Sequence, residues 1–73
     1  MTQNIAVTKD PDGYQHATHS PHRNFCRAVM VKPPSDVWRA AQWCDDVNDA
    51  IAIATSRMAR SSDPVCITTV SYL

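Results

Sequence analysis

The sequence predicts one small α+β domain in which an antiparallel sheet of four or five strands packs against a single helix. Three observations favour this fold class. Runs of β-branched residues are separated by turn-forming residues, one segment has the apolar spacing of an α-helix, and 73 residues suffice for only one compact domain. We assign the range 1–73 to this domain and expect 1–24 to be its less regular part.

The N-terminal third predicts a hairpin followed by a strand. Residues 5–8 and the residues from Tyr14 onward flank Asp10-Pro11-Asp12-Gly13, which is composed of residue types that favour tight turns. The apolar segment 25–31 is typical of the next strand.

Segment 37–44 permits two interpretations. As a helix, it would place Val37, Ala41 and Cys44 on the inner face, with both tryptophans flanking that face. As a strand, Val37, Ala41 and Trp43 would share one side, with Trp38 on the other. We favour the strand, because it buries one large aromatic ring. In either case the two tryptophans are expected to point in different directions.

The strongest prediction is a helix over about 46–60. Its apolar stripe consists of Val47, Ala50, Ile51, Ala54 and Met58. Asp46 is the expected N-cap, and Arg57 and Arg60 in the last turn complement the helix dipole. Ser61-Ser62-Asp63-Pro64 should end the helix. The β-branched residues that follow predict a final strand over about 65–72.

Charge and cysteine content restrict the class of protein. Seven basic and seven acidic residues give a formal net charge of zero, so extensive contact with nucleic acid is not expected. The residues that would serve a minor nucleic-acid contact are Arg23, Arg27, Lys32 and Arg39. Three widely spaced cysteines without a secretory signal favour reduced thiols and the cytoplasm. No apolar run is long enough to span a bilayer, so no membrane partner is expected.

Four potential zinc ligands lie close together in the sequence. They are His16, His19, His22 and Cys26. This spacing is not that of a known structural zinc site, and Pro21 favours an extended chain that would separate His19 from His22. We therefore expect a solvated loop and no cofactor, with a zinc-stabilised domain as the alternative function.

The sequence contains no catalytic motif. A glycine-rich phosphate loop cannot be built with Gly13 alone, and no nucleophile elbow is present. The chain is therefore not expected to be an enzyme.

A protein-interaction module is the first functional hypothesis. One helix covers only one face of a sheet, so the other face should stay open and expose Trp38, while Arg39 lies on the Trp43 side, near a rim. Tryptophan and arginine are enriched among the residues that dominate binding energy. Ile53 and Arg57, at the edge of the helical stripe, are further expected contacts with a host protein or with a second copy in a homodimer. Packing of Trp38 under the N-terminal hairpin is the alternative.

In its size, its lack of a catalytic motif and its sheet-plus-helix layout, the chain resembles small phage- or prophage-encoded accessory proteins of the anti-CRISPR type. The resemblance covers the layout and no residue string. It implies a stoichiometric inhibitor that binds and blocks a host protein, for example a CRISPR–Cas component, in the host cytoplasm.

Overall fold

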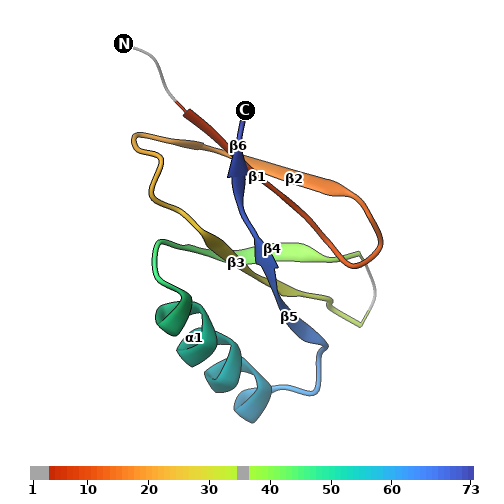
Figure 1. The fold of residues 1–73 in the computed structure, drawn as a ribbon. Helices are drawn as coiled ribbons and strands as arrows, with labels where there is room; N and C mark the ends of the chain where they lie inside the picture. Colours follow the sequence, from red (N-terminus) through yellow and green to blue (C-terminus); the bar gives the residue numbers. More distant parts are fainter. Residues whose placement is uncertain (1–3, 35–36) are drawn as a thin grey trace.

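The chain forms two three-stranded antiparallel sheets and one helix (Figure 1). The computed structural model describes residues 4–34 and 37–73, so 1–3 and 35–36 lie outside the described residues. The elements are β1 (Asn4–Lys9), β2 (Gln15–Ser20), β3 (Arg27–Val31), β4 (Arg39–Cys44), α1 (Val47–Arg60), β5 (Val65–Thr69) and β6 (Ser71–Tyr72). The predicted α+β class is confirmed, but the strands form two sheets rather than one sheet of four or five.

The two sheets stack on each other. The N-terminal sheet has the order β2–β1–β6, and the central sheet has the order β4–β3–β5. α1 packs on one face of the central sheet, and the N-terminal sheet lies on the other side (Figure 1). Half of the segment 1–24, which the sequence predicts to be less regular, forms β1 and β2.

The C-terminal segment belongs to both sheets. Only Val70 separates β5 from β6, and its N–H donates to the carbonyl of Cys26, just before β3, at 3.1 Å. The Leu73 N–H donates to the Ile5 carbonyl of β1 at 3.0 Å. The single strand predicted over 65–72 is thus shared: its first part pairs with β3 and its last part with β1.

An apolar core fills the space between the sheets. Its buried members are Ala6, Ala28, Met30, Trp38 and Val70. Phe25, Trp43 and Tyr72 pack around them and are partly buried. The expectation that one face of the central sheet stays open is therefore wrong, because the N-terminal sheet covers it.

A second core joins the central sheet to α1. Its buried members are Val29, Cys44, Ala50 and Ala54. Since neighbouring residues of a strand point to opposite faces, Val29 faces the helix while Ala28 and Met30 face the N-terminal sheet. The central sheet is consequently buried on both sides.

A bulge in β4 changes the direction of the tryptophans. The strand predicted for this segment is confirmed over residues 39–44. Its register pairs Val29 with Gln42 and Met30 with Ala40, so Ala41 is an extra residue. An extra residue reverses the alternation of side chains beyond it. Trp38 and Trp43 therefore pack in the same core, and the expectation that they point apart is wrong.

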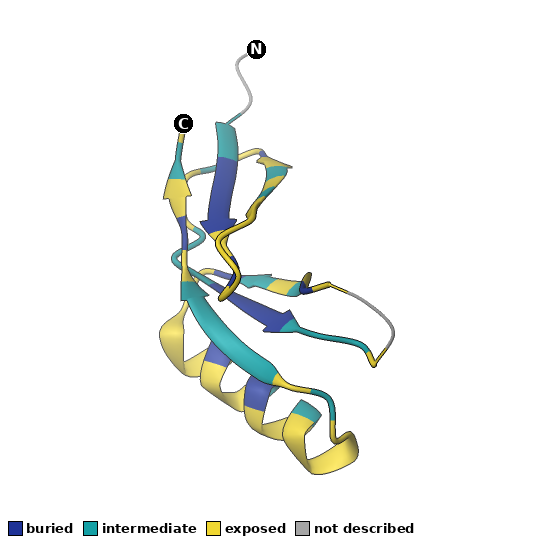
Figure 2. Cartoon of the chain, turned by 90° about the vertical axis from the view of Figure 1, so that its right-hand side faces the viewer, coloured by how far each residue is buried: buried dark blue, intermediate teal, exposed yellow. Residues whose placement is uncertain are grey.

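α1 begins and ends as its sequence predicts, but the face that it buries is narrower than the predicted apolar stripe and lies to one side of it. The Asp46 carboxylate accepts a hydrogen bond from the Asn48 N–H at 2.7 Å and caps the helix. Only Ala50 and Ala54 of the predicted stripe are buried. Val47, Ile51 and Met58 remain 41%, 50% and 56% exposed. Figure 2 shows this distribution, with exposed surface over most of α1.

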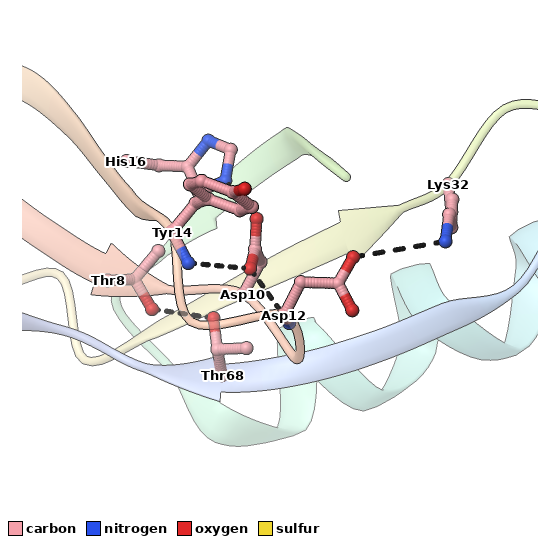
Figure 3. Close-up of polar contacts among 7 residues, drawn as sticks. All are labelled: Thr8, Asp10, Asp12, Tyr14, His16, Lys32 and Thr68. Atoms are coloured by element: carbon pink, nitrogen blue, oxygen red, sulfur yellow. Dashed lines mark hydrogen bonds and ion pairs between the residues drawn. The ribbon is translucent and has the colours of Figure 1, made fainter. Parts of the chain in front are cut away.

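The turn between β1 and β2 is organised by Asp10 (Figure 3). Its buried carboxylate accepts hydrogen bonds from the N–H groups of Asp12 and Tyr14 at 2.9 and 3.0 Å, and it lies 2.8 Å from His16 Nε2. Gly13 adopts a φ of 93°, a left-handed conformation that glycine accepts without strain. The predicted turn is thus confirmed.

Polar contacts hold the hairpin against the central sheet. The Thr8 hydroxyl lies 2.6 Å from the Thr68 hydroxyl and donates to the Thr69 carbonyl at 2.8 Å. On the turn, Asp12 lies 3.9 Å from Lys32 Nζ, which follows β3 (Figure 3). The ion pair is exposed and therefore weak. The Thr8–Thr68 contact is less exposed than this ion pair. It lies at the point where β1 separates from the C-terminal segment 65–73 that both sheets share.

We expect the Trp38→Ala substitution to destabilise the fold. Trp38 is 9% exposed and lies in the core between the sheets, and removing a buried aromatic ring costs about 3–5 kcal/mol. A domain of this length has a total stability of about 4–11 kcal/mol. Urea unfolding followed by circular dichroism measures the loss. Tyr14→Ala is the control, because that ring is 67% exposed and its removal should cost no more than about 0.5 kcal/mol. Equal losses of stability in the two variants would contradict the placement of Trp38 in the core between the sheets.

We also expect the Asp10 turn to lose its stabilising effect in acid. Burial raises the pKa of Asp10, but the hydrogen bonds from His16, Tyr14 and Asp12 together outweigh it and hold the pKa below its ordinary value of 3.8. A depressed pKa adds stability that is present above about pH 4 and is lost as the pH falls through the folded-state pKa. We therefore expect the difference in unfolding free energy between the wild type and Asp10→Asn to be smaller at pH 3 than at pH 5. Urea unfolding at both pH values measures it. A difference that stays constant would exclude this role for Asp10.

Candidate functional site

Two arginines from different elements meet at one end of the central sheet. Arg39 begins β4, and Arg57 lies in the last turn of α1. Both line an open hollow of about 360 Å³, which we call the arginine hollow. The rest of its lining is apolar: Val31, Pro33, Ala40 and Ala41. The β4 bulge at Ala41 lies in this lining, so the irregularity of the strand contributes to the shape of the hollow.

A second hollow adjoins the first. It has a volume of about 340 Å³ and is lined in part by Arg57, Arg60 and Asp63. Because Arg57 lines both hollows, Arg39, Arg57 and Arg60 lie at the same end of the molecule, with Asp63 beside Arg57 and Arg60. Arg60 was not among the expected contacts, although its position three residues after Arg57 places it one turn further along the helix.

The arginines at this end are not ion-paired, although Asp63 lines the second hollow beside Arg57 and Arg60. No carboxylate of a described residue forms an ion pair with Arg39, Arg57 or Arg60. The acidic residues at the start of α1, Asp45, Asp46 and Asp49, lie about 21 Å away, since the helix has 14 residues with a rise of about 1.5 Å each. The basic residues of α1 therefore lie at the end of the helix that adjoins the arginine hollow, and its acidic residue Asp49 lies at the other end.

The expected partner-binding residues do not form a single surface. Arg39 and Arg57 lie together, as described above. Ile53 is half-buried and lines a separate hollow of about 230 Å³ with Trp43 and Asp49, on the β4 side of α1. Trp38 is part of the core, so the expectation of an exposed indole is wrong; its packing opposite the N-terminal sheet is the alternative considered from the sequence.

The candidate zinc ligands are not assembled into a site. His16 and His19 lie on β2 at an odd spacing, so their side chains point to opposite faces of the strand. His16 binds Asp10, while His22 stacks edge-on against Phe25, with ring centroids 4.9 Å apart. Across residues 4–34 and 37–73, no three histidine, cysteine or acidic side chains are grouped so that they could hold a metal ion. Cys26 likewise has no such group around it.

The basic residues considered for nucleic acid lie at two ends of the central sheet. Arg23 stacks over the Tyr72 ring at 4.9 Å, and Arg27 donates to the Cys26 carbonyl at 2.8 Å, both near the start of β3. Lys32 and Arg39 lie at the opposite end, beyond the five residues of β3, which span about 16 Å. The four residues therefore do not make one phosphate-binding patch.

The thiols of Cys44 and Cys66 are poor nucleophiles. Burial raises the pKa of Cys44, and the nearby carboxylates of Asp49 and Asp45 add to this effect. Burial also raises the pKa of Cys66, with a further contribution from Asp10. Since the thiolate is the reactive form, neither sulfur is activated near neutral pH.

Comparisons with known proteins do not point to a function. No protein-family model, curated protein or solved structure matches the chain significantly. In the part of the chain that the structure describes, no helix has the length and apolar character needed to cross a bilayer.

Proposed function

We propose that the chain is a small protein-interaction module that binds an acidic segment of a partner protein in the arginine hollow. The observation that carries the proposal is the convergence of Arg39 and Arg57 on one open hollow without a neutralising carboxylate from a described residue. The two residues are 18 positions apart in sequence, and the packing of α1 on β4 brings them together.

The chemistry of the hollow suits a carboxylate. A guanidinium presents a planar fork of N–H donors that matches the two oxygens of a carboxylate. The apolar lining from Val31, Pro33 and Ala40 would contact the aliphatic part of an aspartate or glutamate side chain and exclude water from the charged pair. Arg57 is already half-buried and held by the helix, which lowers the entropic cost of fixing it.

The lining favours binding over catalysis. It consists of guanidinium and apolar groups, without a histidine, cysteine or carboxylate that could act as a nucleophile or general base. The narrower form of the proposal is a phage-type inhibitor that binds and blocks a host protein such as a CRISPR–Cas component. That form rests on the resemblance in size and layout alone.

Binding of a fluorescein-labelled decapeptide of glutamate and alanine, followed by fluorescence anisotropy, tests the proposal. We expect Arg39→Gln and Arg57→Gln each to weaken binding about 3- to 10-fold, corresponding to about 1 kcal/mol for a partly exposed charge pair. Binding of the wild type should also weaken as the salt concentration rises. Each arginine–glutamate charge pair stays partly exposed to solvent, so salt ions can screen it.

Arg23→Gln is the matched control, since it removes the same charge at the opposite end of the central sheet. An equal loss of affinity in this variant would mean that binding follows total charge and not the hollow. Tighter binding of a labelled oligothymidylate, lost in the Arg39 and Arg57 variants, would replace the protein partner with a nucleic acid and overturn the proposal.

A further inference from the structure

β5 forms an edge of the central sheet, and part of its backbone is unpaired. The hydrogen bonds Lys32 N–H to Pro64 carbonyl and Val70 N–H to Cys26 carbonyl fix the alternation of the antiparallel ladder. Residues 64, 66, 68 and 70 therefore direct their backbone groups toward β3, while Val65, Ile67 and Thr69 direct theirs outward. The Thr69 carbonyl accepts from the Thr8 hydroxyl. Among the described residues, nothing pairs with the outward groups of Val65 and Ile67.

An apolar strip of α1 lies beside this edge. The β4 side of the helix carries Asp49 and Ile53, which line a hollow with Trp43. Helical geometry places Val47, Ile51 and Met58 on the other flank, next to β5, within about 40° of one another at 100° per residue. This flank has no charge. Its residues are Val47, Asn48, Ile51, Thr55, Met58 and Ala59.

We propose that this edge and this flank form a two-fold interface with a second copy of the chain. The two β5 strands would pair antiparallel and join two central sheets into one continuous six-stranded sheet. The uncharged flanks of the two helices would meet on one face of that sheet. The interface is distinct from the arginine hollow, which opens between α1 and β4, so a dimer would display two such hollows.

The free backbone groups determine the register. Val65 of one copy lies opposite Ile67 of the other, and the same pair recurs across the two-fold axis. This arrangement forms four hydrogen bonds from the unpaired N–H and C=O groups of the two residues. A register centred on Ile67 would instead require the Thr69 carbonyl, which the Thr8 hydroxyl already occupies. In the proposed register, Cys66 lies opposite Cys66 of the second copy.

The spacing of the elements fits a second copy of the same chain. Paired strands lie about 4.8 Å apart, and α1 packs over β5 and β3. The two helix axes would then be separated by about 10–14 Å, against about 8–10 Å for helices in direct contact. The side chains of Ile51 and Met58 from both copies would fill the additional space between the two helices. Zero net charge leaves no overall repulsion between the copies.

Sedimentation equilibrium over about 1–500 µM tests the assembly, because the monomer mass is 8.1 kDa and a dimer has twice that mass. We expect a dimer that Val65→Pro and Ile51→Lys each weaken at least about tenfold. Val65→Pro removes an outward N–H and leaves the ladder to β3 intact. Ser56→Lys, on the exposed side away from the flank, is the matched control and should dimerise like the wild type. Circular dichroism checks that every variant stays folded.

Oxidation with copper phenanthroline tests the register. Residues opposite each other in a non-hydrogen-bonded pair have Cα atoms about 4.5 Å apart, within the range of a disulfide. Because burial raises the pKa of Cys66, the oxidation is carried out in alkaline buffer, where the thiolate forms. We expect a covalent dimer on a non-reducing gel that persists in Cys26→Ser and disappears in Cys66→Ser. A monomer at all concentrations would overturn the proposal. So would a dimer that tolerates both Val65→Pro and Ile51→Lys, or a covalent dimer that requires Cys26 and not Cys66.

Discussion

The stacking of the two sheets depends on the segment from Val65 to Leu73, which pairs with β3 on one edge and with β1 on the other. Since one strand is common to both sheets, the sheets cannot separate without breaking its ladder or extending the chain at Val70. Trp38 and Met30 then fill the space between the layers, and Thr8 fixes the point where β1 leaves the shared strand. The backbone constraint and the apolar core therefore stabilise the same arrangement.

Closing this face determines where function can reside. The central sheet is buried by α1 on one side and by the N-terminal sheet on the other, so neither broad face is available to a partner. Two of the surfaces that stay accessible are the margins of the α1 layer. On one margin, Arg39 and Arg57 leave positive charge around an open hollow; on the other, β5 leaves backbone groups beside an uncharged helix flank. The two margins suit different partners because one is electrostatic and the other is apolar and backbone-mediated.

Local features were predictable from the sequence, and features that depend on long-range register were not. Asp46 as a helix cap and the glycine-containing turn follow from local chemistry. The bulge at Ala41 has no sequence signal, yet it decides that Trp38 and Trp43 share a core. The division of the C-terminal strand between two sheets could not be predicted either, because its β-branched composition suits pairing with β1 and with β3 equally. The meeting of Arg39 with Arg57 required knowledge of how α1 crosses β4.

The most direct test of this account is native-state hydrogen exchange, which compares the stability of the N-terminal sheet with that of the central sheet. β1 is paired on both sides, so the amides of Ala6 and Val7 are internal to their sheet, as those of Ala28 and Met30 are to theirs. If the stacked core holds the two sheets as one cooperative unit, the slowest amides of both should exchange with the same free energy, that of global unfolding. Exchange of Ala6 and Val7 many-fold faster than that of Ala28 and Met30 would show that the hairpin opens independently and exposes the face on which Trp38 lies, contrary to this account.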